Sequence, residues 1–178
     1  MSKKFNLRDA YRDARAKRAF KRYKKKHTPD EAKAIIVEKE KIIIPVLTDL
    51  LKDVGISGKT AFTAIVLHSM RVDGIIEDSE IEACAPVLQT VFGDDFDADK
   101  VKADLLAEPS EEMQTALREV TVRIGDLPEQ VKSEIRYIVW IICNVDGKLS
   151  DEEMQWLRDL YGTVIEEPEK KKKKKKSA

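Results

Sequence analysis

Acidic residues at a fixed spacing are the groups in this sequence best suited to chemistry. They lie in segment 144–153, NVDGKLSDEE, and again in segment 71–80, RVDGIIEDSE. At an offset of 73 residues, a valine, two aspartates, a glycine and a glutamate of one segment match those of the other. Carboxylate oxygens in this pattern can ligate a hard divalent cation, or they can cap turns and helix starts.

Aligned to a calcium-binding helix-loop-helix, the second segment offers some ligands and lacks others. Asp146 takes the fifth place of the loop and Glu153 the twelfth, with Asn144 at the third. The first place falls on Ile142, which cannot ligate a metal. Calcium binds about 6–8 oxygens, and neither segment supplies that many. A full calcium loop is therefore not expected here.

The first segment is a poorer calcium loop, because Ser69 and Arg71 take its first and third places. A structural role explains the acidic residues of both segments, since aspartate caps a turn, glycine accepts the left-handed conformation and negative charge suits a first helical turn. The alternative is a weak or shared site for a divalent cation, Ca²⁺ or Mg²⁺. Its candidate ligands are Asp73, Glu80, Asn144, Asp146 and Glu153.

The doubled motif V-D-G-x-[IL]-x-D-x-E, with each copy behind an apolar helix, resembles the tellurite-resistance TerB-like family. The motif is also similar to the related domain of membrane-anchored DnaJ-type co-chaperones. The resemblance covers roughly residues 57–162, and Asp73, Glu80, Asp146 and Glu153 match the acidic pattern of the family. It implies an all-helical domain with an acidic surface and divalent-cation binding. It also implies non-enzymatic work in stress-response or assembly complexes.

The elements that position the two motifs are predicted to be helices. Thr28, Ser57, Asp97 and Ser110 each precede a run with apolar residues at helical spacing, and strand signals are poor. Pro45 is expected to kink or split the helix that starts after Thr28. The predicted fold class is all-α, a compact orthogonal bundle of six to eight helices. The two motif hairpins are expected to be related by an approximate twofold, with their acidic turns on the surface.

Composition favours one soluble helical domain with extensions. The 178 residues are 42% hydrophobic and 37% charged, and no apolar run approaches the ~20 residues of a membrane span. The sequence contains no P-loop, Gly-rich dinucleotide turn or nucleophile–base pairing, so an enzyme is not expected. Cys84 and Cys143 lack metal-site spacing, which favours reduced thiols and a cytoplasmic location.

The net charge of zero hides a division between the ends and the middle of the chain. Residues 1–26 contain twelve Lys or Arg and two Asp, residues 170–176 are seven lysines, and residues 27–169 have a net charge of −17. Blocks of like charge are typical of solvated interaction tails. The predicted organisation is a basic amphipathic arm or helix at 1–27, a TerB-like helical domain at 28–165 and a disordered lysine-rich tail at 166–178.

The basic arm has helical spacing and a thin aromatic stripe. Its predicted polyanion-binding residues are Arg8, Arg12, Arg15, Arg18, Arg22, Lys24, Lys25 and Lys26. Lys and Arg neutralise phosphates and release counterions, so nucleic acid is preferred over an anionic membrane surface as the ligand. Two alternatives remain open: the arm packs on the acidic core of its own molecule, or it binds a protein partner.

Together these observations predict a non-enzymatic TerB-like adaptor in a stress-response or assembly complex. Its acidic core would bind a protein partner or a divalent cation, and its basic termini would contact nucleic acid or another polyanion. The alternative is a structural protein of a nucleic-acid-containing particle, such as a virion or phage component. The mass in solution separates the two hypotheses, because a monomer favours the adaptor and a large symmetric oligomer favours the particle.

Overall fold

The computed structural model describes residues 26–160, and every regular element in that range is a helix. The elements are α2 (Pro29–Leu50), η1 (Lys52–Val54), α3 (Gly58–Arg71), α4 (Asp78–Phe92), α5 (Ala98–Leu106), α6 (Glu111–Arg123), η2 (Ile124–Asp126), α7 (Glu129–Asn144) and α8 (Asp151–Asp159). The predicted all-α bundle of six to eight helices is confirmed. The helix predicted for the basic arm and the lysine-rich tail lie outside the described residues. Within 26–160, no helix has both the length and the apolar composition that a membrane crossing requires.

Side-chain caps begin the helices where the sequence predicts them. Thr28 Oγ1 accepts a hydrogen bond from the Glu31 N–H at 3.2 Å, and the Glu31 carboxylate accepts one from the Thr28 N–H at 3.2 Å. Ser57, Asp97 and Ser110 accept from the N–H three residues on, at 3.0, 2.9 and 3.3 Å. These bonds satisfy N–H groups that have no partner within the helix.

Pro45 lies inside α2 and does not split it, because the helix continues to Leu50 as one element. The adjacent turn is supported by contacts from α3. Thr48 Oγ1 donates to the carbonyl of Ile44 at 2.9 Å and accepts from the Gly58 N–H at 3.2 Å. A Cβ on Gly58 would lie 2.1 Å from that carbonyl oxygen, so only glycine lets α3 begin this close to α2.

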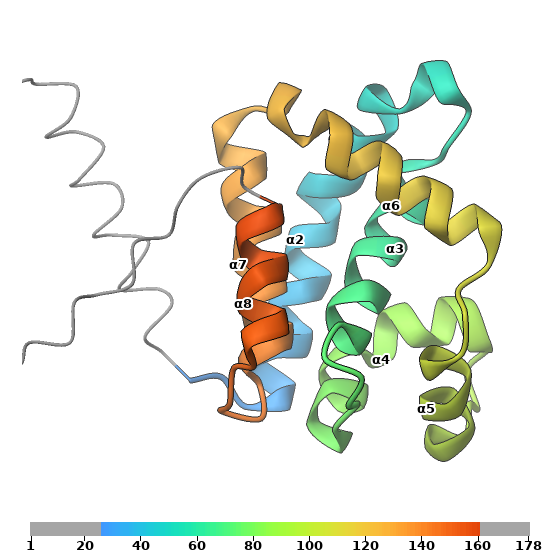
Figure 1. The fold of residues 1–178 in the computed structure, drawn as a ribbon, viewed down its shortest axis with the longest axis vertical. Coiled ribbons are helices and arrows are strands. Elements are labelled where there is room, and N and C mark those ends of the chain that lie inside the picture. The colour runs from blue at the N-terminus through green and yellow to red at the C-terminus, as the bar shows by residue number, and fades with distance from the viewer. Residues whose placement is uncertain (1–25, 161–178) are drawn as a thin grey trace, which may run out of the picture.

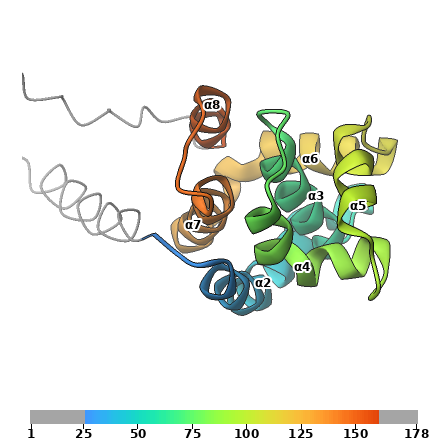
Figure 2. The same cartoon turned by 90° about the horizontal axis from the view of Figure 1, so that it is seen from below.

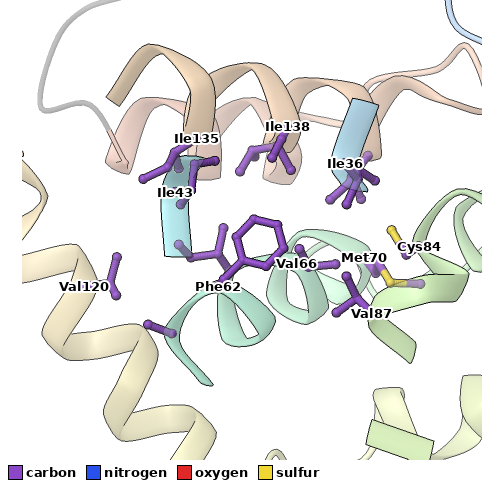
Figure 3. Close-up of a cluster of buried hydrophobic side chains, with 14 of the residues drawn as sticks. Ile36, Ile43, Phe62, Val66, Met70, Cys84, Val87, Val120, Ile135 and Ile138 are labelled. Atoms are coloured by element: carbon purple, nitrogen blue, oxygen red, sulfur yellow. The ribbon is translucent and has the colours of Figure 1, made fainter. Parts of the chain in front are cut away.

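Two helices, α3 and α7, supply much of the core, and each buries nine of its residues. α2 packs against α3, α4 and α7, while α6 packs on α3 and α8 packs on α7 (Figure 1). Figure 3 shows how buried side chains of α2, α3 and α7 meet; they are Ile36, Ile43, Phe62, Val66, Ile135 and Ile138. The helix that precedes each acidic motif is therefore a core helix.

Both acidic motifs lie toward the same end of the bundle. The α3–α4 connection and the α7–α8 connection are in the lower half of Figure 1, where the first described residues also lie. Figure 2, seen from below, places the α3–α4 connection beside α8. The approximate twofold between the two motif hairpins stays a prediction.

Candidate functional site

The two motif turns share one local geometry. In the first turn, Asp73 Oδ1 accepts a hydrogen bond from the Ile75 N–H at 3.0 Å. In the second, Asp146 Oδ1 accepts one from the Lys148 N–H at 2.8 Å. The prediction that aspartate side chains cap both turns is confirmed, and one oxygen of each carboxylate is held by the backbone.

The glycine after each aspartate adopts the left-handed conformation, with φ of +77° at Gly74 and +83° at Gly147. The Gly74 N–H donates to the carbonyl of Arg71, and the Gly147 N–H donates to the carbonyl of Asn144, both at 3.0 Å. A residue with a Cβ is strained at such a φ, which explains why glycine ends both core helices.

The glutamates of the two motifs are buried at the starts of α4 and α8. Glu80 is 5% exposed and Glu153 is 6% exposed. The Glu80 carboxylate accepts from the Glu77 N–H at 2.9 Å, and the Glu153 carboxylate accepts from the Ser150 N–H at 2.7 Å. Ser150 Oγ accepts in turn from the Glu153 N–H at 3.1 Å, and the two bonds together form a capping box.

The acidic turns were predicted to lie on the surface, and the exposure of their aspartates differs from that of the glutamates that follow. Asp146 is exposed and Asp73 is half-buried, whereas Glu80 and Glu153 are buried. A capping side chain folds back over its own helix start instead of extending into solvent. In this fold the starts of α4 and α8, where Glu80 and Glu153 lie, are also buried by neighbouring helices.

The negative charges of Asp73 and Asp146 act on the protonation of the two buried glutamates. Burial is the largest cause that raises the pKa of Glu80 to about 8, and the negative charges of Glu153, Asp73 and Asp146 add to it, while the Glu77 N–H opposes the rise. Burial also raises the pKa of Glu153, with further contributions from Asp73 and Asp146. The two motifs are therefore close enough for their charges to interact, and we call these four residues the acidic face: Asp73, Glu80, Asp146 and Glu153.

A buried hydrogen-bond network joins α3 to the helices that flank the second motif. Trp156 Nε1 donates to Ser69 Oγ at 3.0 Å, and Ser69 Oγ donates to the carbonyl of Ile65 at 2.7 Å. The Cys143 thiol donates to the Ser69 carbonyl at 3.7 Å. The ring of His68 packs edge-on against Trp156, and burial lowers the pKa of His68.

Both cysteines are buried and neither is in a disulfide. Burial raises the pKa of the Cys84 thiol, with a contribution from the charge of Glu80. Burial likewise raises the pKa of the Cys143 thiol. Because the thiolate is the reactive and metal-binding form, these two groups act as packed apolar side chains.

The acidic face does not form a closed metal cage. Among residues 26–160, no group of three or more His, Cys, Asp or Glu side chains is placed to hold a metal ion. Each carboxylate of the face already accepts a backbone hydrogen bond, which leaves fewer oxygens for a cation that prefers about 6–8 of them. Binding of Ca²⁺ or Mg²⁺ by the predicted ligands, Asn144 included, stays a prediction.

Lys26 is the one predicted polyanion-binding residue that falls within residues 26–160; the other seven, from Arg8 to Lys25, lie outside them. Its ammonium group lies against the second turn, because a Cβ on Gly147 would be 2.8 Å from Lys26 Nζ. Next to it, the His27 ring nitrogen Nε2 is 3.1 Å from the Tyr137 hydroxyl oxygen on α7. The sequence gives no local signal for this contact, since Lys26 and Gly147 lie in distant parts of the chain.

Comparison with known proteins identifies the family. A family model described as tellurite resistance protein TerB matches residues 59–170, which are more than half of the chain and include both motifs. Searches of curated proteins and of solved structures find no match. The matched residues carry the whole acidic face, and the chain belongs to the TerB family.

Proposed function

We propose that this protein is a non-enzymatic adaptor whose acidic face recognises a basic segment of a protein partner. One observation carries the proposal: in two motifs 73 residues apart, Asp73 and Asp146 lie close enough to act on the same buried glutamate, Glu80. Within residues 26–160, no Lys or Arg side chain forms an ion pair with any residue of the acidic face. The exposed Asp146 and the half-buried Asp73 thus have negative charge that a partner's lysine or arginine side chains can pair with.

The two turns differ in a way that suits a protein ligand. Ile75 follows the first Asp-Gly pair and is 60% exposed, whereas the equivalent position in the second turn is Lys148. An exposed isoleucine beside carboxylates offers a basic segment one apolar contact in addition to ion pairs. The same proposal places the protein in a stress-response or assembly complex. Its location would be the reducing cytoplasm, where Cys84 and Cys143 stay thiols.

The non-enzymatic role is supported by what the polar groups of the site do. The carboxylates of the acidic face accept backbone hydrogen bonds at turns and helix starts. His68 is packed against Trp156, and His27 contacts Tyr137. These are structural tasks, and they leave the second carboxylate oxygens of Asp73 and Asp146 for recognition.

Capture from cell extract by the full chain tests the proposal. Asp73→Asn/Asp146→Asn removes two charges and keeps the oxygen that each turn needs as acceptor. Asp94→Asn/Asp95→Asn removes two charges from exposed residues outside the motifs and serves as the matched control. We expect a partner captured by the wild type and the control but not by the motif variant, with capture that weakens as salt rises. Equal capture by all three proteins would refute the acidic face as the binding surface.

A second candidate function, nucleic-acid binding, is favoured by the charge of the two ends. Residues 1–26 have a net charge of +10, and residues 170–176 are all lysine. Binding to DNA or RNA is expected to weaken steeply with salt and to vanish when both segments are removed. Unchanged affinity after both truncations would exclude this function, and a large symmetric oligomer in solution would point instead to the structural protein of a particle.

A further inference from the structure

We infer that α8 forms a latch on the bundle: it undocks as a unit, by movement at the turn 145–150, while the other helices stay packed. Undocking changes the acidic face, because Glu153 is on α8 and Asp146 is in the turn. The inference names a regulation of that face and in that respect rests on the proposed function. Its own test requires no partner.

The first observation is that the two copies of the motif share a turn and differ in the helix that follows it. Each turn has an aspartate that accepts a backbone hydrogen bond and a left-handed glycine. After the first turn, α4 has fifteen residues and buries six of them, whereas α8 has nine and buries three. The apolar residue of the turn differs in the same direction, since Ile76 is buried and Leu149 is half-buried. The same turn is therefore followed by a firmly packed helix in one copy and by a weakly packed helix in the other.

The second observation is that the contacts between α8 and α3 converge on one side chain. Trp156 Nε1 donates to Ser69 Oγ at 3.0 Å, and the indole ring meets the ring of His68 edge-on, with 4.4 Å between their centroids. Leu157 and Leu160 complete the buried side of this segment. Helices shorter than about 12–15 residues are marginal on their own in water, so α8 depends on these few contacts.

The third observation is the buried carboxylate at the start of α8. Glu153 is 6% exposed, and its carboxylate accepts from the Ser150 N–H of its own helix start at 2.7 Å. Because both partners of that bond move with α8, undocking returns the carboxylate to water and keeps the bond. Burial of this charged group therefore opposes docking.

The position of α8 allows it to move alone. Figure 2 places α8 at the edge of the bundle, where it packs on α7. α5 also buries only two residues, but α4 and α6 hold its two ends, and its Lys102 forms an ion pair with Asp78 of α4. α8 is the last helix within residues 26–160, so in that range movement at one turn is enough to undock it.

Undocking carries Glu153 away from the first motif and reshapes the second turn. A basic ligand that contacts both turns binds the docked state better, so it holds α8 in place. By linkage, a substitution that releases α8 weakens the binding of such a ligand. The latch thus controls how much of the acidic face a partner meets.

Amide hydrogen exchange in the full chain tests the inference, with α4 as the matched helix. NMR follows the exchange at several urea concentrations below the unfolding transition. We expect the amides of residues 154–160 and the indole N–H of Trp156 to exchange at least about tenfold faster than the slowest amides of α4. Urea should barely change the rates in α8, because undocking exposes little surface, and should raise the rates in α4 steeply.

Two substitutions separate undocking from unfolding of the whole bundle. Ile43→Val weakens the core between α2 and its neighbours, so it should speed exchange in α4 about fivefold and leave α8 unchanged. Ser69→Ala removes the acceptor of the indole N–H, so it should speed exchange in α8 about tenfold. Trp156→Phe removes the donor of the same bond and should have the same effect on α8.

Three results would overturn the inference. One is equal exchange in α8 and α4, with the same dependence on urea. Another is an Ile43→Val variant that speeds exchange in both helices by the same factor. The third is fast exchange confined to the last residues of α8 with a protected indole N–H, which would show fraying of the helix end. None of the three affects the capture experiment, so the two proposals fail independently.

Discussion

Trp156 Nε1 lies 3.0 Å from the hydroxyl oxygen of Ser69, and both side chains are buried. Ser69 is on α3, just before the first acidic turn, and Trp156 is on α8, just after the second. The bond therefore spans 87 residues of sequence and connects the two motifs. Because Ser69 also donates to the carbonyl of Ile65, its hydroxyl is fully engaged.

Removal of this hydroxyl by Ser69→Ala leaves the buried indole N–H without its acceptor. We expect the free energy of unfolding to fall by about 1–3 kcal/mol, as measured by urea denaturation. Thr121→Val is the control, since Thr121 Oγ1 donates only to the carbonyl of Leu117 in its own helix. If Ser69→Ala destabilises no more than the control, the bond does not hold the motifs together.

The left-handed glycine of the second turn gives a further prediction. Gly147→Ala is expected to cost about 1–2 kcal/mol of stability, because φ is +83° and Lys26 must also move aside. Gly125→Ala is the matched control, since no atom lies within 4 Å of its Cβ position and its φ lies outside the left-handed region. Thermal unfolding compares the two variants, and equal midpoints would contradict the geometry assigned to the turn.

Burial of Glu80 makes stability depend on pH in a predictable direction. The folded carboxyl has a pKa of about 8, above the ordinary 4.5. Between these pH values the folded protein keeps a proton that the unfolded chain has lost. The free energy of unfolding therefore falls as pH rises, by at most about 1.4 kcal/mol per pH unit from this group. Below about pH 4.5 and above about pH 8 the contribution is flat.

Glu80→Gln cannot ionise and keeps an acceptor for the Glu77 N–H. We expect this variant to be more stable than the wild type at pH 8 and similar to it near pH 4.5, by urea denaturation across this range. Glu112→Gln, at an exposed position of α6, should follow the wild-type curve. Parallel curves for Glu80→Gln and the wild type would show that the carboxyl of Glu80 is not protonated in the folded state.

Calcium titration by calorimetry separates the metal hypothesis from the turn hypothesis. The described residues form no closed cage, so we expect binding weaker than the ~10⁻⁷–10⁻⁵ M of calcium-sensor loops. Asp146→Ala/Glu153→Ala is the control for any heat that does appear. Tight binding that this double variant abolishes would establish a metal site at the second motif.

The sequence predicted the features that depend on local bonds. Thr28 and Ser150 cap their helices through partners three residues away, and Gly147 directly follows a turn-forming aspartate. A few consecutive residues therefore determine each of these features. Pro45 was expected to kink or split its helix, and the split does not occur, because α2 runs through the proline as one element. Close by, the Gly58 N–H of α3 donates to Thr48 Oγ1, a contact that no local rule predicts.

The candidate site was predicted in part. The sequence identified the acidic residues and their repetition, and the fold brings the two motifs close enough for their charges to interact. Three features arise from contacts between distant segments. They are the burial of Glu80, the hydrogen bond between Ser69 and Trp156, and the contact of Lys26 with Gly147. No spacing within one segment indicates such contacts, so they could be obtained only from the structure.

The central claim is that two distant motifs share one acidic face. A ¹³C-detected pH titration of the Glu80 carboxyl group measures it most directly, in the wild type and in Asp73→Asn/Asp146→Asn. We predict a midpoint near pH 8 in the wild type. In the variant the midpoint should fall but stay above 4.5, because burial remains the largest cause. A wild-type midpoint near 4.5, or one that does not move when both aspartate charges are removed, would contradict the account.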